Sequence, residues 1–278
     1  MALALVLVLV ACSGGSGGGS DDRRASPTRP LRTAPLSGRT FWFGDADGSL
    51  FEVELDRASV VRSGDRASLV VTGRARNLLT TPGRLRPTAS ADLGSSSVRA
   101  TGGVSGEVAG SASEPFRLTA AGVPASLRPT SVTLTFGPAS TNQVVVPLGA
   151  GAFTADAPLA GVAGTAELDV SPGVTLRLRS SLLYPRYESG RKGQHRLWIA
   201  TEADAAPVEP AYVPGLHPSL ETPDGTVQSI GDQYILDPHT EFVEQAIIEG
   251  PIAGRYTLSV LEITTGTTSS ATFVVPDR

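Results

Sequence analysis

The sequence has few of the residues that build most catalytic and metal sites. Among 278 residues there are one cysteine and three histidines, and Lys192 is the only lysine. One cysteine excludes an intramolecular disulfide, and no cysteine or histidine has the spacing of a zinc motif. The segment Gly103-Val104-Ser105-Gly106 lacks the Gly-x-Ser-x-Gly spacing of a nucleophile elbow. We therefore expect a protein that is not an enzyme and that uses no cofactor and no metal.

The chain also has little net charge, −4 at pH 7. A charge of this size produces no overall field that would attract nucleic acid or acidic lipid. Nearly all of the positive charge is arginine, which we attribute to codon usage rather than to recognition of phosphate or carboxylate groups. We expect no nucleic acid among the partners of this protein.

Helical periodicity is nearly absent, and apolar residues alternate with polar residues instead. A period of two indicates strands that are buried on one face. It occurs in five segments separated by Gly or Pro turns, which are 51–56, 131–136, 166–170, 174–179 and 256–260. The only helix candidate, from Thr240 to Ile248, ends at Gly250-Pro251. We predict an all-β protein with two or three antiparallel β-sandwich modules of immunoglobulin-like or jelly-roll-like type, on a disordered N-terminal tether.

An apolar segment from Ala2 to Ala11 opens the chain and is shorter than the roughly twenty residues of a transmembrane helix. Its length fits the hydrophobic region of a signal peptide, and it ends in Leu9-Val10-Ala11-Cys12. These four residues resemble the lipobox of bacterial lipoproteins. The resemblance implies that the preceding peptide is removed and that the Cys12 thiol carries lipid. Ser13 after the cysteine favours the outer membrane over the inner membrane. An ordinary secretory signal with a chance cysteine is the alternative.

The segment after Cys12 is rich in Gly, Ser, Pro, Thr and Arg and has hardly any apolar residue, so we expect no ordered structure there. The expected strands exceed what one sandwich of about a hundred residues holds. We predict the following divisions: residues 1–11, signal peptide; 12–37, lipidated flexible tether; 38–111, β module; 112–182, immunoglobulin-like β module; 183–278, C-terminal β-sandwich module. Residues 38–182 could also form one larger sandwich.

Two stretches near the C-terminus together form a further recognisable pattern. One is the apolar segment Phe242 to Ile248 followed by Pro251-Ile252-Ala253-Gly254-Arg255-Tyr256, and the other is Leu220-Glu221-Thr222-Pro223-Asp224-Gly225. They resemble the accessory β-sandwich domains that follow secreted bacterial proteases. The resemblance implies a non-catalytic module that binds or stabilises another molecule. Residues 214–219 lack the acidic side chains that hold metal in related domains, so the resemblance does not imply a calcium site here.

Two acidic clusters are candidates for metal binding, and for both we favour another interpretation. In Asp45-Ala46-Asp47-Gly48-Ser49, Leu50 stands where an EF-hand loop has its glycine, so we predict a hairpin turn. Asp237, His239 and Glu241 would point the same way on an extended chain. Pro238 disfavours a regular strand there, and we predict a solvated loop.

The segment from Tyr184 to Trp198 combines cations with aromatic side chains. Such a combination can stack on sugars and neutralise anionic groups. The candidate ligand-binding residues are Arg186, Tyr187, Arg191, Lys192, Arg196 and Trp198. We predict that they lie on a β-hairpin and contact an anionic envelope glycan if the protein binds one. A plain polar hairpin with a Ser189-Gly190 turn is the alternative.

Together these features predict a membrane-anchored bacterial envelope lipoprotein that acts as a non-catalytic binding, adhesion or envelope-assembly component. The expected partners are the membrane, through the lipid on Cys12, and an envelope glycan or envelope protein. The alternative function is an accessory subunit that positions a secreted hydrolase on its glycan or peptide substrate.

Overall fold

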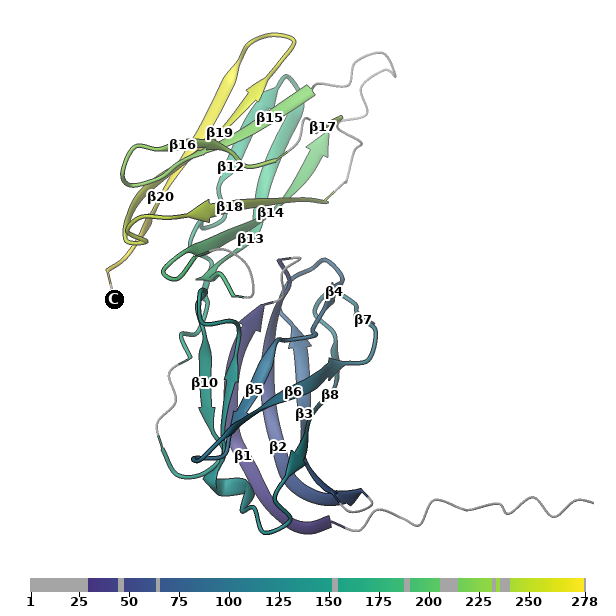
Figure 1. Ribbon diagram of the computed structural model, residues 1–278. Helices are drawn as coiled ribbons and strands as arrows, with labels where there is room; N and C mark the ends of the chain where they lie inside the picture. Colours follow the sequence, from purple (N-terminus) through teal and green to yellow (C-terminus); the bar gives the residue numbers. More distant parts are fainter. Residues whose placement is uncertain are drawn as a thin grey trace, which may run out of the picture.

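The computed structural model describes residues 30–44, 48–63, 66–151, 155–187, 191–205, 215–231, 234–235 and 241–277. Strands make up most of this part of the chain, and its one helical element is a 3₁₀ turn, η1 (Pro129–Ser131). The prediction of an all-β, sandwich-like fold is confirmed. The strands form two units stacked end to end, which we name the first sandwich and the second sandwich (Figure 1). Within the described residues, no helix has the length and apolar character needed to cross a membrane.

The first sandwich is built from one antiparallel sheet and a small two-stranded sheet. Its strands are β1 (Pro30–Gly44), β2 (Leu50–Ser63), β3 (Arg66–Asn77), β4 (Gly83–Arg84), β5 (Ala89–Asp92), β6 (Ser97–Val104), β7 (Glu107–Val108), β8 (Ser113–Val123), β9 (Thr133–Phe136) and β10 (Val144–Pro147). The eight-stranded sheet has the order β1-β2-β3-β8-β6-β5-β9-β10, and β4 pairs with β7. The large sheet folds over, so that strands from its two ends enclose one core.

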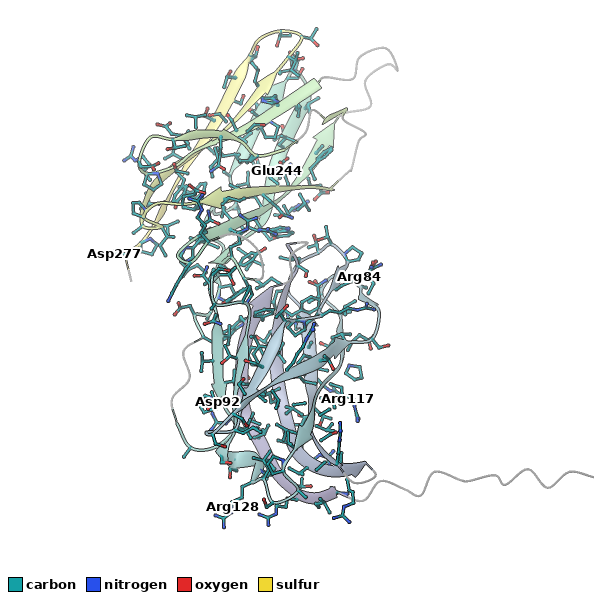
Figure 2. All side chains as sticks on the ribbon, viewed as in Figure 1. Arg84, Asp92, Arg117, Arg128, Glu244 and Asp277 are labelled. Atoms are coloured by element: carbon teal, nitrogen blue, oxygen red, sulfur yellow. The ribbon has the colours of Figure 1, made fainter. Side chains whose placement is uncertain are left out.

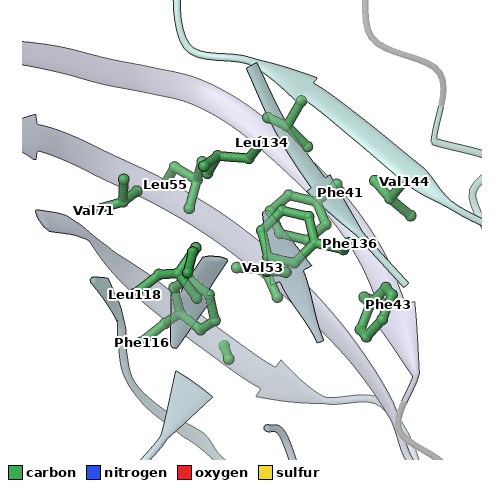
Figure 3. Close-up of a cluster of buried hydrophobic side chains, with 14 of the residues drawn as sticks. Phe41, Phe43, Val53, Leu55, Val71, Phe116, Leu118, Leu134, Phe136 and Val144 are labelled. Atoms are coloured by element: carbon green, nitrogen blue, oxygen red, sulfur yellow. The ribbon is translucent and has the colours of Figure 1, made fainter. Parts of the chain in front are cut away.

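The core of the first sandwich follows from the alternating pattern. Phe51, Val53 and Leu55 in β2 are fully buried, while the glutamates between them point outward. The folding-over of the sheet brings the rings of Phe41 in β1 and Phe136 in β9 to 4.7 Å between centroids. Figure 3 shows these side chains gathered between the two layers. Aromatic contacts at this distance stabilise a core beyond the area that they bury.

The second sandwich consists of two facing antiparallel sheets. Its strands are β11 (Leu159–Ala160), β12 (Glu167–Ser171), β13 (Val174–Pro185), β14 (His195–Ala205), β15 (Gly215–Glu221), β16 (Val227–Ser229), β17 (Tyr234–Ile235), β18 (Glu241–Ile248), β19 (Gly254–Glu262) and β20 (Thr268–Val275). One sheet has the order β11-β13-β14-β18 with β12 beside β13, and the other has the order β16-β15-β19-β20 with β17 beside β15. Aliphatic side chains from both sheets form the core between them.

The structure joins segments across both of the boundaries that we predicted between modules, by strand pairing at the first and by a continuous strand at the second. β8 lies beyond residue 111 but pairs with β3 from Arg76↔Ser113 to Ala67↔Val123, so residues 38–147 share one sheet. β13 runs through residue 182 and pairs with β14 along its length. Pairing between strands that are distant in the sequence leaves no local signal, which is why the alternating pattern did not locate these connections.

Residues 30–37, which we predicted to be part of the tether, belong to β1 instead. Ala34 and Leu36 are 7% and 2% exposed, and this part of β1 pairs with the end of β2. Two apolar residues among Pro, Ser, Thr and Arg are a weak signal for a strand. The helix candidate from Thr240 to Ile248 was also wrong, since residues 241–248 form β18, which pairs with β14 as the last strand of its sheet.

Candidate functional site at the junction of the two sandwiches

The predicted cationic hairpin is present, and it lies against the first sandwich. β13 and β14 pair antiparallel from Val174↔Ala205 to Pro185↔His195, and residues 188–190 of the turn lie outside the described residues. Figure 1 shows this end of the hairpin next to the upper end of the first sandwich. The six candidate residues therefore belong to an interface within the chain, which we name the junction.

The junction buries most of the side chains that we predicted to contact a glycan. Tyr187, Arg196 and Trp198 are 4%, 7% and 1% exposed, and Arg186 is half-buried. Only Arg191 and Lys192 are exposed. Buried rings cannot stack on an external sugar, so the structure does not bring the six residues together as a surface.

These side chains are buried because residues 197–200 of β14 are covered on both faces of the strand. Leu197 and Ile199 point into the core of the second sandwich, whereas Trp198 and Ala200 join the core cluster of the first sandwich. A continuous apolar run such as Leu197-Trp198-Ile199-Ala200 is typical of a strand that is covered on two sides. This signal was present in the sequence, and the emphasis on the flanking cations concealed it.

Hydrogen bonds to Asn142 join the two sandwiches at one edge of the junction. Its Nδ2 donates to the carbonyl oxygens of Arg186 and Gln194 at 2.9 and 2.8 Å, and its Oδ1 accepts from the backbone N–H of Gly193 at 2.9 Å. The backbone N–H of Lys192 donates to the carbonyl of Ser140 at 3.1 Å. One amide side chain thus uses both kinds of polar atom across the interface.

Gly48, just ahead of β2, also contacts the second sandwich at the junction. The Tyr184 hydroxyl donates to the carbonyl oxygen of Gly48 at 2.8 Å. A Cβ atom at Gly48 would lie 1.8 Å from Nη1 of Arg196, and the φ of +93° also favours glycine. Arg196 therefore lies against the backbone of Gly48 and has a packing role. β1 and β2 pair up to Gly44↔Leu50, as predicted for a hairpin, while Asp45 and Asp47 lie outside the described residues.

Tyr187 contacts the aromatic core of the first sandwich. Its ring centroid lies 5.1 Å from that of Phe43. Burial, with a smaller contribution from the negative charge of Asp156, raises the pKa of Tyr187 above its ordinary range. The phenol is therefore neutral at physiological pH, as its place in a packed interface requires.

Two small hollows border the junction, with volumes of about 200 and 120 Å³. Both are lined by Asp156, Pro185 and His195, and Lys192 lies beside the larger one. Neither has the size or the apolar lining that is usual for a small-molecule site. Among the described residues, no group of three or more His, Cys, Asp and Glu side chains could hold a metal ion. Of the predicted loop ligands, Asp237 and His239 lie outside the described residues, and Glu241 begins β18.

The two C-terminal stretches that resemble protease accessory domains lie side by side. β15 pairs with β19, with Leu220 opposite Leu258. A Cβ atom at Gly254 would lie 2.7 Å from the Cβ of Pro223, so the glycine permits the close approach of the two stretches. The Tyr256 hydroxyl donates to the carbonyl oxygen of Ile252, four residues upstream, at 2.9 Å. This bond closes the corner before β19, much as tyrosine corners do in other sandwiches.

Asp224 stabilises the neighbouring turn. Its carboxylate accepts hydrogen bonds from the hydroxyl of Thr222 at 2.5 Å and from the backbone N–H of Thr226 at 3.1 Å. These bonds, that of Thr222 first, lower the pKa of Asp224 below its usual range. The carboxylate is thus occupied within its own turn.

The geometry defines a class of protein, a pair of β-sandwiches joined through a packed interface. No protein-family model and no curated protein matches the chain.

Proposed function

We propose that this protein is a bacterial envelope lipoprotein, anchored through lipid on Cys12, that acts as a non-catalytic binding, adhesion or envelope-assembly component. Its second sandwich is the part presented to a partner, which is an envelope glycan or another envelope protein. The observation that carries this proposal is the path of β1 through the first sandwich.

β1 connects the end of the chain that follows the tether to the junction. Gly44, at the end of β1, lies next to Tyr187 of the second sandwich. A Cβ atom added to Gly44 would be 3.6 Å from Cδ2 of the Tyr187 ring. Pro30 is the first residue of this strand, which has 15 residues. At about 3.3 Å per residue, such a strand is roughly 45 Å long. Pro30 therefore lies at the end of the first sandwich that is remote from the second sandwich (Figure 1).

The junction supports a role as a spacer. Domains that meet through small polar interfaces usually move relative to each other. Here the core cluster of the first sandwich includes Tyr184, Tyr187, Trp198 and Ala200 from the second sandwich. Shared core packing holds the two sandwiches in one orientation. With an anchor at Cys12, the first sandwich would therefore act as a rigid spacer between the membrane end of the chain and the second sandwich.

The second candidate is an accessory subunit that positions a secreted hydrolase on its glycan or peptide substrate. It is favoured by the contact between Gly254 and Pro223, which joins the two stretches that resemble protease accessory domains. Copurification distinguishes the candidates: a hydrolase recovered with the second sandwich favours the accessory role, and envelope-assembly proteins or glycan favour the first.

Cys12→Ser tests the anchor. We expect the variant to leave the membrane fraction or to accumulate with its leader uncleaved, because a multiply acylated cysteine is the attachment. The measurement is fractionation together with metabolic labelling by a fatty acid, and Ser13→Ala is the control. Equal membrane association and equal labelling of variant and parent would contradict the proposal.

A further inference from the structure

The end of the first sandwich that is remote from the junction is strongly basic. The strand register places four termini there: Pro30 of β1 lies opposite Val61, Ser63 of β2 lies opposite Arg66, and Ala67 of β3 lies opposite Val123 of β8. The turn η1 packs against β1 and β2 at the same end. Exposed arginines from these segments share this surface, which we name the basic end: Arg32, Arg62, Arg66 and Arg128.

Acidic side chains do not neutralise this surface within the described residues. Segments 30–33, 60–63, 66–68 and 121–131 contain neither aspartate nor glutamate. The β5–β6 hairpin contributes Asp92, which lies opposite Thr133 and whose carboxylate accepts a hydrogen bond from the backbone N–H of Gly94. Asp65 lies outside the described residues. In that part of the chain, no ion pair involves the four guanidinium groups. Figure 2 shows Arg128 at the tip of the first sandwich, with Asp92 closer to its middle. The positive potential is therefore local, although the whole chain carries −4.

The basic end also carries an exposed apolar side chain at the point where the tether begins. Leu31 is 42% exposed and is adjacent to Arg32. An apolar side chain among cations is the combination by which proteins bind the interface of an anionic bilayer.

The tether determines which anionic surface this end meets. Seventeen residues lie between Cys12 and Pro30, as counted in the sequence. The flexibility that the sequence predicts for this segment would give it an average span of about 20–25 Å. A lipid on Cys12 would keep the basic end at high effective concentration near headgroup phosphates.

We infer that the basic end binds the phosphate groups of anionic lipid headgroups in the membrane that carries the Cys12 lipid. This inference rests on the proposed anchor. The lipid then acts as the first attachment and the arginines as a second, weaker one. With this end held against the bilayer, β1 and the second sandwich point away from the membrane.

Vesicle cosedimentation tests the inference on the chain from Ser13 to Arg278, which contains every described residue and carries no lipid. One set of vesicles is phosphatidylcholine alone and the other contains phosphatidylglycerol as well. We expect binding to the second set only, weakening as salt rises because headgroup attraction is screened within a Debye length of about 8 Å.

A pair of matched double variants locates the contact. Each basic side chain near an anionic surface contributes roughly fivefold to binding, so Arg62→Glu with Arg128→Glu should weaken binding at least about 25-fold. Arg117→Glu with Arg255→Glu changes the net charge equally at exposed positions away from the basic end, and should leave the affinity close to that of the parent. Melting curves check folding, and Arg62→Gln with Arg128→Gln replaces the first pair if it unfolds.

Three outcomes would overturn the inference: no binding by the parent chain, equal binding to both sets of vesicles, or equal weakening by both double variants. None of these affects the anchor, which the labelling of Cys12 tests separately. Conversely, if the full chain is never labelled by fatty acid at Cys12 in cells but the chain from Ser13 to Arg278 binds the anionic vesicles, the anchor alone is overturned.

Discussion

The two sandwiches differ in how completely each encloses its own core. The first folds a single eight-stranded sheet over a cluster rich in phenylalanine. The second places two sheets face to face, and the outer face of one sheet carries Trp198 and Ala200 into the first sandwich. The first sandwich therefore needs the second only at one end, whereas the second has an apolar patch on the outer face of one sheet, around Trp198 and Ala200, that it cannot cover by itself; farther along β14 the same face carries Glu202 and Asp204 in ion pairs. A module boundary placed at a linker in the sequence does not reveal this asymmetry, because the second sandwich depends on the first through side-chain packing and not through the linker.

The largest expected effect is on the free energy of unfolding, when each of the two tryptophans is replaced by alanine. Trp198 is buried at the junction, and Trp42 is half-buried on β1, so the pair compares the two environments. Trp198→Ala should lower the free energy of unfolding by about 3–5 kcal/mol, the usual cost of removing a fully buried aromatic side chain. Trp42→Ala, at a half-buried position of β1, should cost much less. Chemical denaturation measures both.

Trp198→Phe refines this comparison. The indole Nε1 of Trp198 is buried and has no hydrogen-bond partner within the described residues. Phenylalanine keeps most of the apolar contact and removes that unsatisfied donor, so it should retain most of the stability. Equal effects of Trp198→Ala and Trp42→Ala would disprove the dependence of the second sandwich on the junction.

A smaller effect is expected from the polar edge of the junction. Asn142→Ala removes three hydrogen bonds between the sandwiches and leaves buried polar atoms unsatisfied, at a cost of about 1–3 kcal/mol. The loss should separate thermal unfolding into two transitions, with the second sandwich melting first. Gln143→Ala is the control, since Gln143 bonds only to Gly137 in its own sandwich. Identical single transitions in both variants would show that Asn142 does not couple the two units.

The smallest expected effect is a difference between the two sandwiches in how their thermal stability changes at high pH. All tyrosines lie from Tyr184 onward, so the first sandwich has none. Burial, and secondarily the charge of Asp224, raises the pKa of Tyr256 to about 12. A phenol with a raised pKa in the folded state contributes stability that is full below its unfolded value of about 10 and is lost as pH rises through 12.

The melting temperature of the second sandwich should therefore fall between pH 10 and 12. Tyr256→Phe should make the melting temperature fall less steeply with pH, and the raised pKa of Tyr187 at the junction contributes to the fall that remains. A slope that is unchanged in Tyr256→Phe would exclude ionisation of this phenol as a cause.

Local patterns predicted the fold class but not the connections. The alternation of Phe51, Val53 and Leu55 with glutamates is a property of a single strand, and it was visible in the sequence. Whether β8 pairs with β3 depends on the whole sheet, so no local segment records it. In Phe242 to Ile248, an apolar run of strand length was ambiguous between helix and strand.

The candidate site was misjudged for a similar reason. Cations next to aromatic residues suggested an exposed ligand surface, but Arg196 lies against Gly48 and Trp198 is buried in a neighbouring sandwich. Burial on the second face of a sheet depends on a partner elsewhere in the chain. Only the uninterrupted apolar run from Leu197 to Ala200 indicated it.

The course of β1 has a mechanical consequence. A pull between the membrane and a partner held by the second sandwich would enter the first sandwich at Pro30 of β1 and leave it at the junction, where the carbonyl of Gly48, just ahead of β2, accepts a hydrogen bond from Tyr184. Hydrogen bonds of an antiparallel ladder stand perpendicular to the strands, so such a force shears the β1–β2 ladder and loads its bonds together instead of opening them one by one. The strand that connects anchor and junction is thus oriented to carry tension.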